Sequence, residues 1–107
     1  MALTAENLNR LPQKPGVYLF KDARGEVLYV GKAKNLKNRI RSYFAKSPEG
    51  QAPRTALLVA ELVDLDYIIV SSELESLMLE NNLIKQYQPR FNVRLRDDKN
   101  YQFLKID

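Results

Sequence analysis

The chain has 107 residues, of which 45% are hydrophobic and 28% charged, with a net charge of +4. Its length fits one domain with a modest core, and its composition is that of an ordinary globular protein. It contains neither cysteine nor histidine, which excludes disulfide bonds, cysteine-ligated zinc and catalysis by a thiolate or an imidazole.

The N-terminus has neither the basic nor the apolar stretch of a signal peptide, and no apolar run is long enough to span a bilayer. Together with the lack of cysteine, this predicts a cytoplasmic protein that does not bind membranes. No exposed apolar stripe stands out in the sequence, so we expect the domain to be monomeric.

The first part of the chain predicts a short helix followed by a hairpin. Thr4 can cap the helix, which ends before Pro12. Residues 16–20 alternate in the manner of a strand, and residues 27–30 form a second strand. Because only the turn signal at residues 22–25 separates them, the two strands should pair antiparallel.

Two further helices are predicted in the middle of the chain. Asn35 can cap the first, and Leu36, Ile40 and Phe44 recur at a spacing that gives it a core stripe. Pro53 suits the first turn of the next helix, which should reach about residue 63.

A third strand and the longest helix follow. Residues 67–70 are rich in β-branched side chains and predict a central strand. Ser72 and Glu75 match a capping box that opens a helix to about Tyr87. Pro89 ends that helix.

Charge is distributed unevenly along the chain. Residues 27–48 carry six lysines and arginines and no acidic residue, whereas residues 55–84 carry six acidic residues and no basic one. Residues 85–96 are basic again. Such runs are usually solvated faces; the alternative is a basic surface, folded from two segments, that binds a polyanion.

Glu80 is an unusual residue in the longest predicted helix. At about 100° per residue it shares an arc with Leu77, Leu83, Ile84 and Tyr87. An unpaired carboxylate is costly to bury, so Glu80 needs a cation. Periodicity alone favours an ion pair with an arginine of the basic helix; the alternative is Mg²⁺, which one carboxylate and several waters can hold.

Four residues in and after the hairpin could form a phosphate site. Tyr29 is in the second strand, Lys32 lies just after it, and Arg39 and Tyr43 share one face of the basic helix. A phenol is a poor base at its usual pKa of about 10, but a nearby cation lowers that pKa. For any single strand tyrosine, packing alone is the simpler interpretation.

The ordered motifs resemble those of the GIY-YIG nuclease family. Gly16-Val17-Tyr18 and, after ten residues, Tyr29-Val30-Gly31 match its two signature triplets, with valine replacing isoleucine in both. Within that family the chain looks like the N-terminal domain of UvrC, the bacterial excision nuclease subunit. The further matching stretches are residues 11–12, 32–34, 38–43, 80–85, 87, 89 and 91–93. The resemblance covers about residues 11–98.

The resemblance implies a small α/β domain with a central three-stranded, mainly antiparallel sheet flanked by helices. It implies a metal-dependent DNA endonuclease domain at residues 1–97, with residues 98–107 starting the next segment of a longer protein. The implied reaction is the 3′-side incision at damaged double-stranded DNA in nucleotide excision repair. The implied protein partner, UvrB, would bind through parts of the protein outside this chain.

The resemblance also implies roles for single residues. Tyr29 would be the general base that activates water, Tyr18 would help to place that phenol, and Lys32 would assist deprotonation. Arg39 and Tyr43 would contact the scissile phosphate.

The remaining implied residues hold the metal, the site and the DNA. Glu80 would be the one protein ligand of a single Mg²⁺ or Mn²⁺ ion, and Asn92 would support the site by hydrogen bonding. The match favours the metal interpretation of Glu80, because it explains the tyrosines and the basic helix together. Lys34, Lys37 and Arg41 are the predicted DNA-binding residues.

Two alternatives stay open on the sequence. One is another GIY-YIG enzyme, of the homing or structure-specific type. The other is a non-catalytic nucleic-acid-binding domain, whose salt-dependent binding would be indifferent to Tyr29→Phe and Glu80→Gln.

Overall fold

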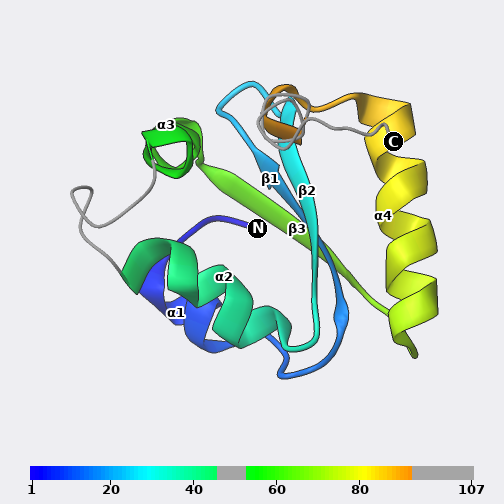
Figure 1. Cartoon of the computed structure of the whole chain (residues 1–107). Coiled ribbons are helices and arrows are strands. Elements are labelled where there is room, and N and C mark those ends of the chain that lie inside the picture. Colours follow the sequence, from blue (N-terminus) through cyan, green and yellow to red (C-terminus); the bar gives the residue numbers. More distant parts are fainter. Residues whose placement is uncertain (46–52, 93–107) are drawn as a thin grey trace.

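The computed structural model describes residues 1–45 and 53–92 of the chain. Its elements follow one another in the order α1, β1, β2, α2, α3, β3 and α4 (Figure 1). Their bounds are α1 Ala5–Asn9, β1 Gly16–Lys21, β2 Val27–Ala33, α2 Leu36–Ala45, α3 Pro53–Glu61, β3 Asp64–Ile69 and α4 Glu73–Tyr87. Residues 90–92 are also helical. The predicted boundary between residues 97 and 98 lies outside the described residues.

The strands form one antiparallel sheet in the order β2-β1-β3, which confirms the predicted fold class. The hairpin lies where the sequence predicts it, with Gly25 of its turn at a φ of 83°. The prediction of a central strand at residues 67–70 is wrong, because β1 is central and β3 lies at an edge. Ile68 and Ile69 are exposed there; a β-branched run reports strand propensity, not the place of the strand in the sheet.

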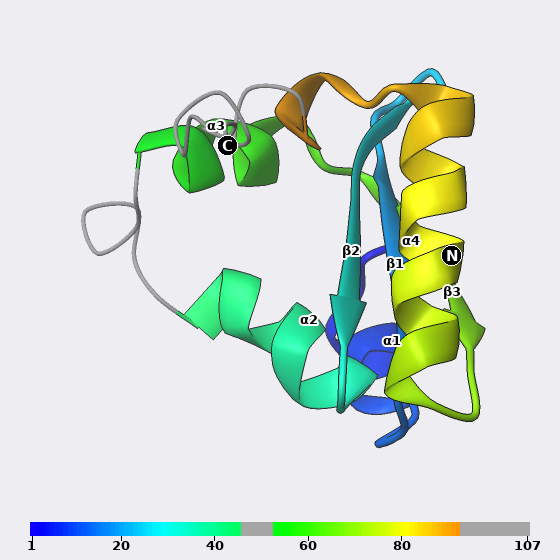
Figure 2. The same cartoon turned by 45° about the vertical axis from the view of Figure 1, so that its right-hand side comes forward.

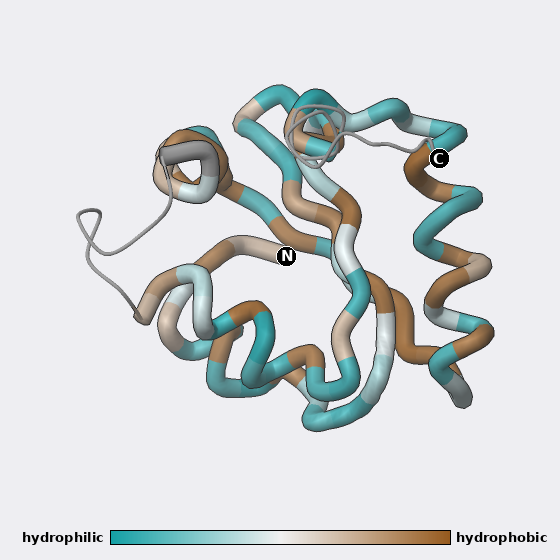
Figure 3. The backbone as a smooth tube through the Cα atoms, in the orientation of Figure 1, coloured by the Kyte–Doolittle hydropathy of each residue, from teal (hydrophilic) through white to brown (hydrophobic). Residues whose placement is uncertain are grey.

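The sheet separates two hydrophobic clusters, as the alternation in β1 predicts. Tyr18 and Phe20 belong to the cluster on the side of α2 and α3, whereas Val17 and Leu19 belong to the cluster that contains Ile84 of α4. Figure 2 shows α4 along one side of the sheet and α2 on the other. In Figure 3, α2 and α4 mix polar and apolar residues, as expected of helices with one face on a core.

Helix α2 buries a different stripe from the predicted one. Leu36 and Ile40 are fully buried, but Phe44 is 37% exposed and Tyr43 is buried in its place. At about 100° per residue, position 43 returns to within about 20° of position 36, whereas position 44 lies about 80° away. As a result, the hydroxyl-bearing ring of Tyr43, and not the phenyl ring of Phe44, faces the sheet.

The predicted caps are present with one difference. Thr4 accepts a hydrogen bond from the Asn7 amide, and Ser72 accepts one from the Glu75 amide. The Glu75 carboxylate, however, accepts from the amide of Ser71 at 2.7 Å and not from that of Ser72, so the capping box is only half formed. Glu73 and Glu75 lie in the first turn of α4, where the helix dipole favours acidic residues.

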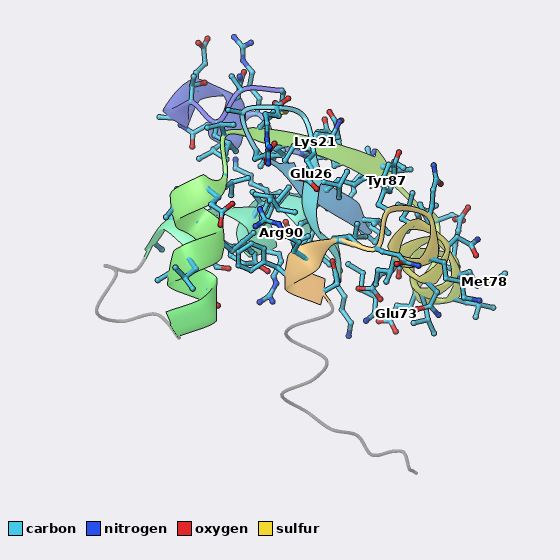
Figure 4. All side chains as sticks on the ribbon, turned by 90° about the horizontal axis from the view of Figure 1, so that it is seen from above. Lys21, Glu26, Glu73, Met78, Tyr87 and Arg90 are labelled. Carbon is cyan, nitrogen blue, oxygen red and sulfur yellow. The ribbon has the colours of Figure 1, made fainter. Side chains whose placement is uncertain are left out.

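Helix α4 ends and exposes side chains in ways that the sequence did not predict. Gln88 ends it in the left-handed conformation, with φ 45°, and its amide donates to the Ile84 carbonyl at 2.8 Å. The outer side of α4 exposes Leu74, Leu77 and Met78, and Met78 is turned away from the strands (Figure 4). In the described part of the chain, no helix is long and apolar enough to cross a membrane.

The first signature glycine fills a place that no side chain can share. A Cβ at Gly16 would lie 2.4 Å from the carbonyl oxygen of Ile68 on β3 and 2.6 Å from Cδ1 of Leu36. We expect Gly16→Ala to lower the free energy of unfolding by about 1–3 kcal/mol, because the backbone oxygen cannot move without disturbing the sheet. Urea unfolding followed by circular dichroism measures it.

The control is Ala23→Ser on the exposed hairpin turn, which should stay within about 0.5 kcal/mol of the parent chain. An unchanged stability for Gly16→Ala would mean that the strands do not approach as closely as described.

Candidate active site

Four aromatic rings pack together on the α2 side of the sheet. Phe20 and Tyr43 meet edge to face, with ring centroids 4.9 Å apart and planes at 87°. The Tyr18 ring lies 6.0 Å from that of Tyr43 and 6.2 Å from that of Tyr29. Such pairs add about 0.5–1.5 kcal/mol each beyond the area they bury. The cluster therefore fixes α2 against the hairpin and sets where the three hydroxyls lie.

The hydroxyls and one guanidinium form a connected network. The Tyr18 and Tyr43 hydroxyls are 2.8 Å apart, and Nε of Arg39 donates to the Tyr18 hydroxyl at 3.4 Å. The Arg39 guanidinium also lies 5.3 Å from the centre of the Tyr43 ring. Tyr43 also lies close enough to Tyr29 to raise the pKa of that phenol. Four of the predicted catalytic residues thus lie together.

The second signature glycine makes this packing possible. Gly31 is directly opposite Tyr18 in the hairpin. A Cβ there would lie 2.4 Å from the Tyr18 hydroxyl oxygen and 2.9 Å from Cε2 of Tyr29. Gly31 therefore leaves the space in which the two signature tyrosines meet.

Burial controls the ionisation of both signature tyrosines. It is the largest cause that raises the pKa of Tyr18 and of Tyr29, and the neighbouring Tyr43 raises both further. Arg39 lowers the pKa of each, as the sequence analysis expects of a cation, but burial outweighs it. Both phenols are therefore neutral at pH 7 in the structure described here.

Glu80 reaches the site from α4, on the far side of strand β2. It is half-buried, and its carboxylate lies close enough to Tyr29 to raise the pKa of that phenol. The predicted apolar arc is partly wrong, because Leu77 and Tyr87 are exposed. The buried face of α4 instead passes through Ser76, with the partly buried Leu79 and Leu83, and Ile84.

The donor set around Glu80 fits a largely hydrated cation. Among residues 1–45 and 53–92 there is no group of three or more acidic, histidine or cysteine side chains that could hold a metal. Mg²⁺ is commonly bound by one or two carboxylates and keeps several waters. A single half-buried carboxylate beside neutral phenols suits that ion better than zinc.

Asn92 is clamped to the backbone of strand β2. Its Oδ1 accepts from the Val30 amide and its Nδ2 donates to the Val30 carbonyl, both at 2.8 Å. The side chain is 6% exposed. Because Val30 follows Tyr29 directly, the pair of bonds ties the segment after α4 to the residue next to Tyr29.

The basic residues do not share one surface. Lys32 lies within β2, not after it as the sequence analysis expects, and is exposed. With Lys34 and Arg39 it lines a pocket of about 380 Å³. Arg41 instead lines a pocket of about 570 Å³ between α1 and α2, and Lys37 is half-buried in the first turn of α2.

Other residues of the 380 Å³ pocket were not predicted as site residues. They are Pro15, Ala33, Asn35, Asn38, Glu73 and Ser76. A helical spacing of four could have found Ser76, since it lies one turn before Glu80 on the same face of α4. Nothing in the sequence pattern indicates that Asn38 and Glu73 line the same pocket.

Removal of the Asn92 clamp should free a backbone group at the site. Asn92→Ala leaves the buried Val30 amide without its side-chain acceptor, which should lower the free energy of unfolding by about 1–3 kcal/mol. Amide hydrogen exchange, measured by NMR, should speed up at Val30 more than at the centre of β1. Asn81→Ala, on the exposed side of α4, is the matched control. Unchanged Val30 protection in Asn92→Ala would contradict the clamp.

The buried Tyr18 phenol should make stability depend on alkaline pH. Its pKa in the folded chain is raised above the value of about 10 for an unfolded chain. Tyr18 therefore contributes stability that is complete below about pH 10 and is lost as pH rises toward the folded pKa, by up to about 1.4 kcal/mol per pH unit. Urea unfolding between about pH 9 and 11 should show a shallower loss in Tyr18→Phe. Equal slopes in the two proteins would contradict this account.

Comparisons with known proteins identify the family of the chain. The family model of the UvrC-like GIY-YIG domain matches residues 14–93. UvrABC system protein C of Carboxydothermus hydrogenoformans is 56% identical over 101 residues, and that of Acidobacterium capsulatum is 58% identical over 101 residues. Each match covers 94% of this chain and 16% of the relative, so the chain spans about a sixth of the length of these relatives.

A solved structure resembles the fold as well as the sequence. It is the GIY-YIG N-terminal endonuclease domain of UvrC from Thermotoga maritima, bound to magnesium as its catalytic divalent cation. The two share 40% identity with a TM-score of 0.70, over 80% of this chain and 91% of that one. The chain described here belongs to the family of UvrC-like GIY-YIG endonuclease domains.

Proposed function

We propose that this domain makes the 3′-side incision at damaged DNA in nucleotide excision repair, with Tyr29 as general base and one divalent cation at Glu80. The observation that carries the proposal is the convergence of three tyrosine hydroxyls, the Arg39 guanidinium and the Glu80 carboxylate. Their types match what phosphodiester hydrolysis needs: a base, a cation for the phosphoryl oxygens and a place for a metal.

The chain's own residues would divide the work as follows. Tyr29 holds its proton while the site is empty, because burial raises its pKa, and gives it up when positive charge enters the site. Arg39, already directed at the tyrosine network, would bind a non-bridging phosphate oxygen. Tyr43 would donate to the same phosphate, and Tyr18 would keep Tyr43 and Arg39 in place.

Three further features support the mechanism. A divalent cation at Glu80 would supply charge that stabilises the phosphoryl and departing oxygens. Lys32, exposed on β2 where it lines the 380 Å³ pocket, would favour loss of the Tyr29 proton through its own positive charge. Asn92 would keep Tyr29 at a fixed distance from Glu80 through its bonds to Val30.

The wider setting is part of the same proposal. Relatives called UvrABC system protein C are about six times longer than the stretch matched here, so we place damage recognition and UvrB binding in regions beyond this chain. We propose a monomeric domain of residues 1–97 that acts on damaged duplex DNA in the cytoplasm. The family match over residues 14–93 favours this function over a homing-type nuclease.

The decisive experiment is incision of a lesion-bearing duplex preloaded with UvrB, with the domain carried in its full-length protein and Mg²⁺ present. Tyr29→Phe removes the proton acceptor and Glu80→Gln removes the metal ligand. Each should lower the single-turnover rate of 3′ nicking by about a hundredfold or more while DNA binding persists. Chelation of Mg²⁺ should abolish nicking in the parent protein.

Matched controls remove the same groups elsewhere. Tyr87→Phe deletes an exposed hydroxyl on α4, and Glu6→Gln neutralises an exposed carboxylate on α1; both should nick at the parent rate. If Tyr29→Phe and Glu80→Gln also nick at the parent rate, the domain is a nucleic-acid-binding module and not the nuclease.

A further inference from the structure

The 380 Å³ pocket lies beside the tyrosine network and has the character of an anion site. It is bounded by the β2–α2 connection on one wall and by the start of α4 on the other. Three cations line it, Lys32, Lys34 and Arg39, against one carboxylate, Glu73. Arg39 belongs to both places, since it also donates to the Tyr18 hydroxyl. A strand of DNA held at the tyrosines would therefore pass this pocket with a neighbouring phosphate.

Side chains, not the helix terminus, must bind an anion here. The amide of Leu36 donates to the Lys14 carbonyl at 3.0 Å, and that of Lys37 donates to the Pro12 carbonyl at 3.1 Å. The next amide, of Asn38, donates to Oδ1 of Asn35. With its first amides already paired, the N-terminus of α2 offers no donors to a phosphate. The lysines and Arg39 are left as the charged donors of the pocket.

One of these lysines is engaged by the pocket's own carboxylate. Nζ of Lys34 lies 3.1 Å from Oε1 of Glu73, so the pair joins the two walls. Both side chains are largely exposed, 85% for Lys34 and 73% for Glu73. Ion pairs as exposed as this one are weak, and a phosphate offers the lysine more negative charge and more acceptor oxygens than a carboxylate does. The pair can therefore exchange partners.

We propose that Glu73 is a built-in competitor of the DNA backbone: it holds Lys34 in the free domain, and a phosphate flanking the scissile one displaces it. Glu73 then sets the affinity for DNA below what the basic pocket could reach alone. The inference rests on the proposed function only in taking DNA as the ligand of the pocket.

The two halves of the pair should act in opposite directions. We measure binding of a fluorescein-labelled duplex oligonucleotide to the chain by anisotropy at several salt concentrations. Lys34→Gln should weaken binding about two- to fivefold and reduce the salt slope by about 0.9, the loss of one phosphate contact. Glu73→Gln should tighten binding by a similar factor of about two to five, because Lys34 is free from the start.

A purely structural ion pair gives a different pattern. In that case both variants would bind DNA equally, or both more weakly, than the parent chain, and either result would overturn the proposal. The double variant, Lys34→Gln with Glu73→Gln, shows whether Glu73 acts through Lys34. If it does, the gain in DNA affinity from Glu73→Gln should disappear in the Lys34→Gln background. A gain of full size there would also overturn the proposal.

The chain provides a matched control pair away from the pocket. Arg10 and Glu6 of α1 are 2.8 Å apart and similarly exposed, 72% and 71%. Glu6→Gln changes the net charge by the same amount as Glu73→Gln and should leave the affinity within about 1.5-fold of the parent value, since the pair lies outside the pocket. If Glu6→Gln and Glu73→Gln raised the affinity for DNA equally, the change in net charge would explain the increase, and the competitor proposal would be refuted.

The result can be told apart from the test of nuclease function. The binding assay does not depend on Tyr29 or Glu80, so opposite effects of Lys34→Gln and Glu73→Gln would stand even if the Tyr29→Phe protein nicked normally. Conversely, if Tyr29→Phe and Glu80→Gln abolish nicking but Glu73→Gln does not raise the affinity for DNA, only the competitor proposal is refuted.

Discussion

The placement of Tyr18 against Gly31 is the constraint on which the rest of the site depends. The absence of a side chain at Gly31 lets the Tyr18 hydroxyl come close to the strand that carries Tyr29. From there Tyr18 reaches Tyr43 and Arg39 on α2. A methyl group at Gly31 would move the Tyr18 hydroxyl that connects the sheet to α2, and with it the Arg39 guanidinium that we propose binds the phosphate.

The site is built from neutral groups that surround a small number of charges. Burial keeps both signature tyrosines protonated, so the aromatic cluster can pack as a core without the cost of a buried phenolate. The charges lie at its margins: Arg39 on α2, Glu80 on α4 and Lys32 on β2. Under the proposed mechanism, this arrangement would supply a base and a metal ligand without histidine or cysteine, and without loss of a packed interior.

Much of the fold followed from the sequence, and the errors have physical causes. The caps at Thr4 and Asn35, the hairpin and the two faces of β1 follow from local spacing and were predicted correctly. The order of the strands and the burial of Tyr43 in place of Phe44 depend on how α2 meets the sheet, which local periodicity cannot decide. The residues proposed for catalysis came from the family resemblance. The meeting of Lys34 with Glu73 joins segments 39 residues apart in the chain and needed the structure.

The clamp formed by Asn92 has a consequence for how the domain behaves among its own copies. Strand β2 is an edge of the sheet, and an open edge is a template on which another chain can add a strand. The Asn92 amide has the same donor and acceptor as a peptide group and occupies both backbone positions of Val30. It therefore blocks the middle of that edge with a single side chain, and protects the domain from edge-to-edge aggregation at the strand that carries Tyr29.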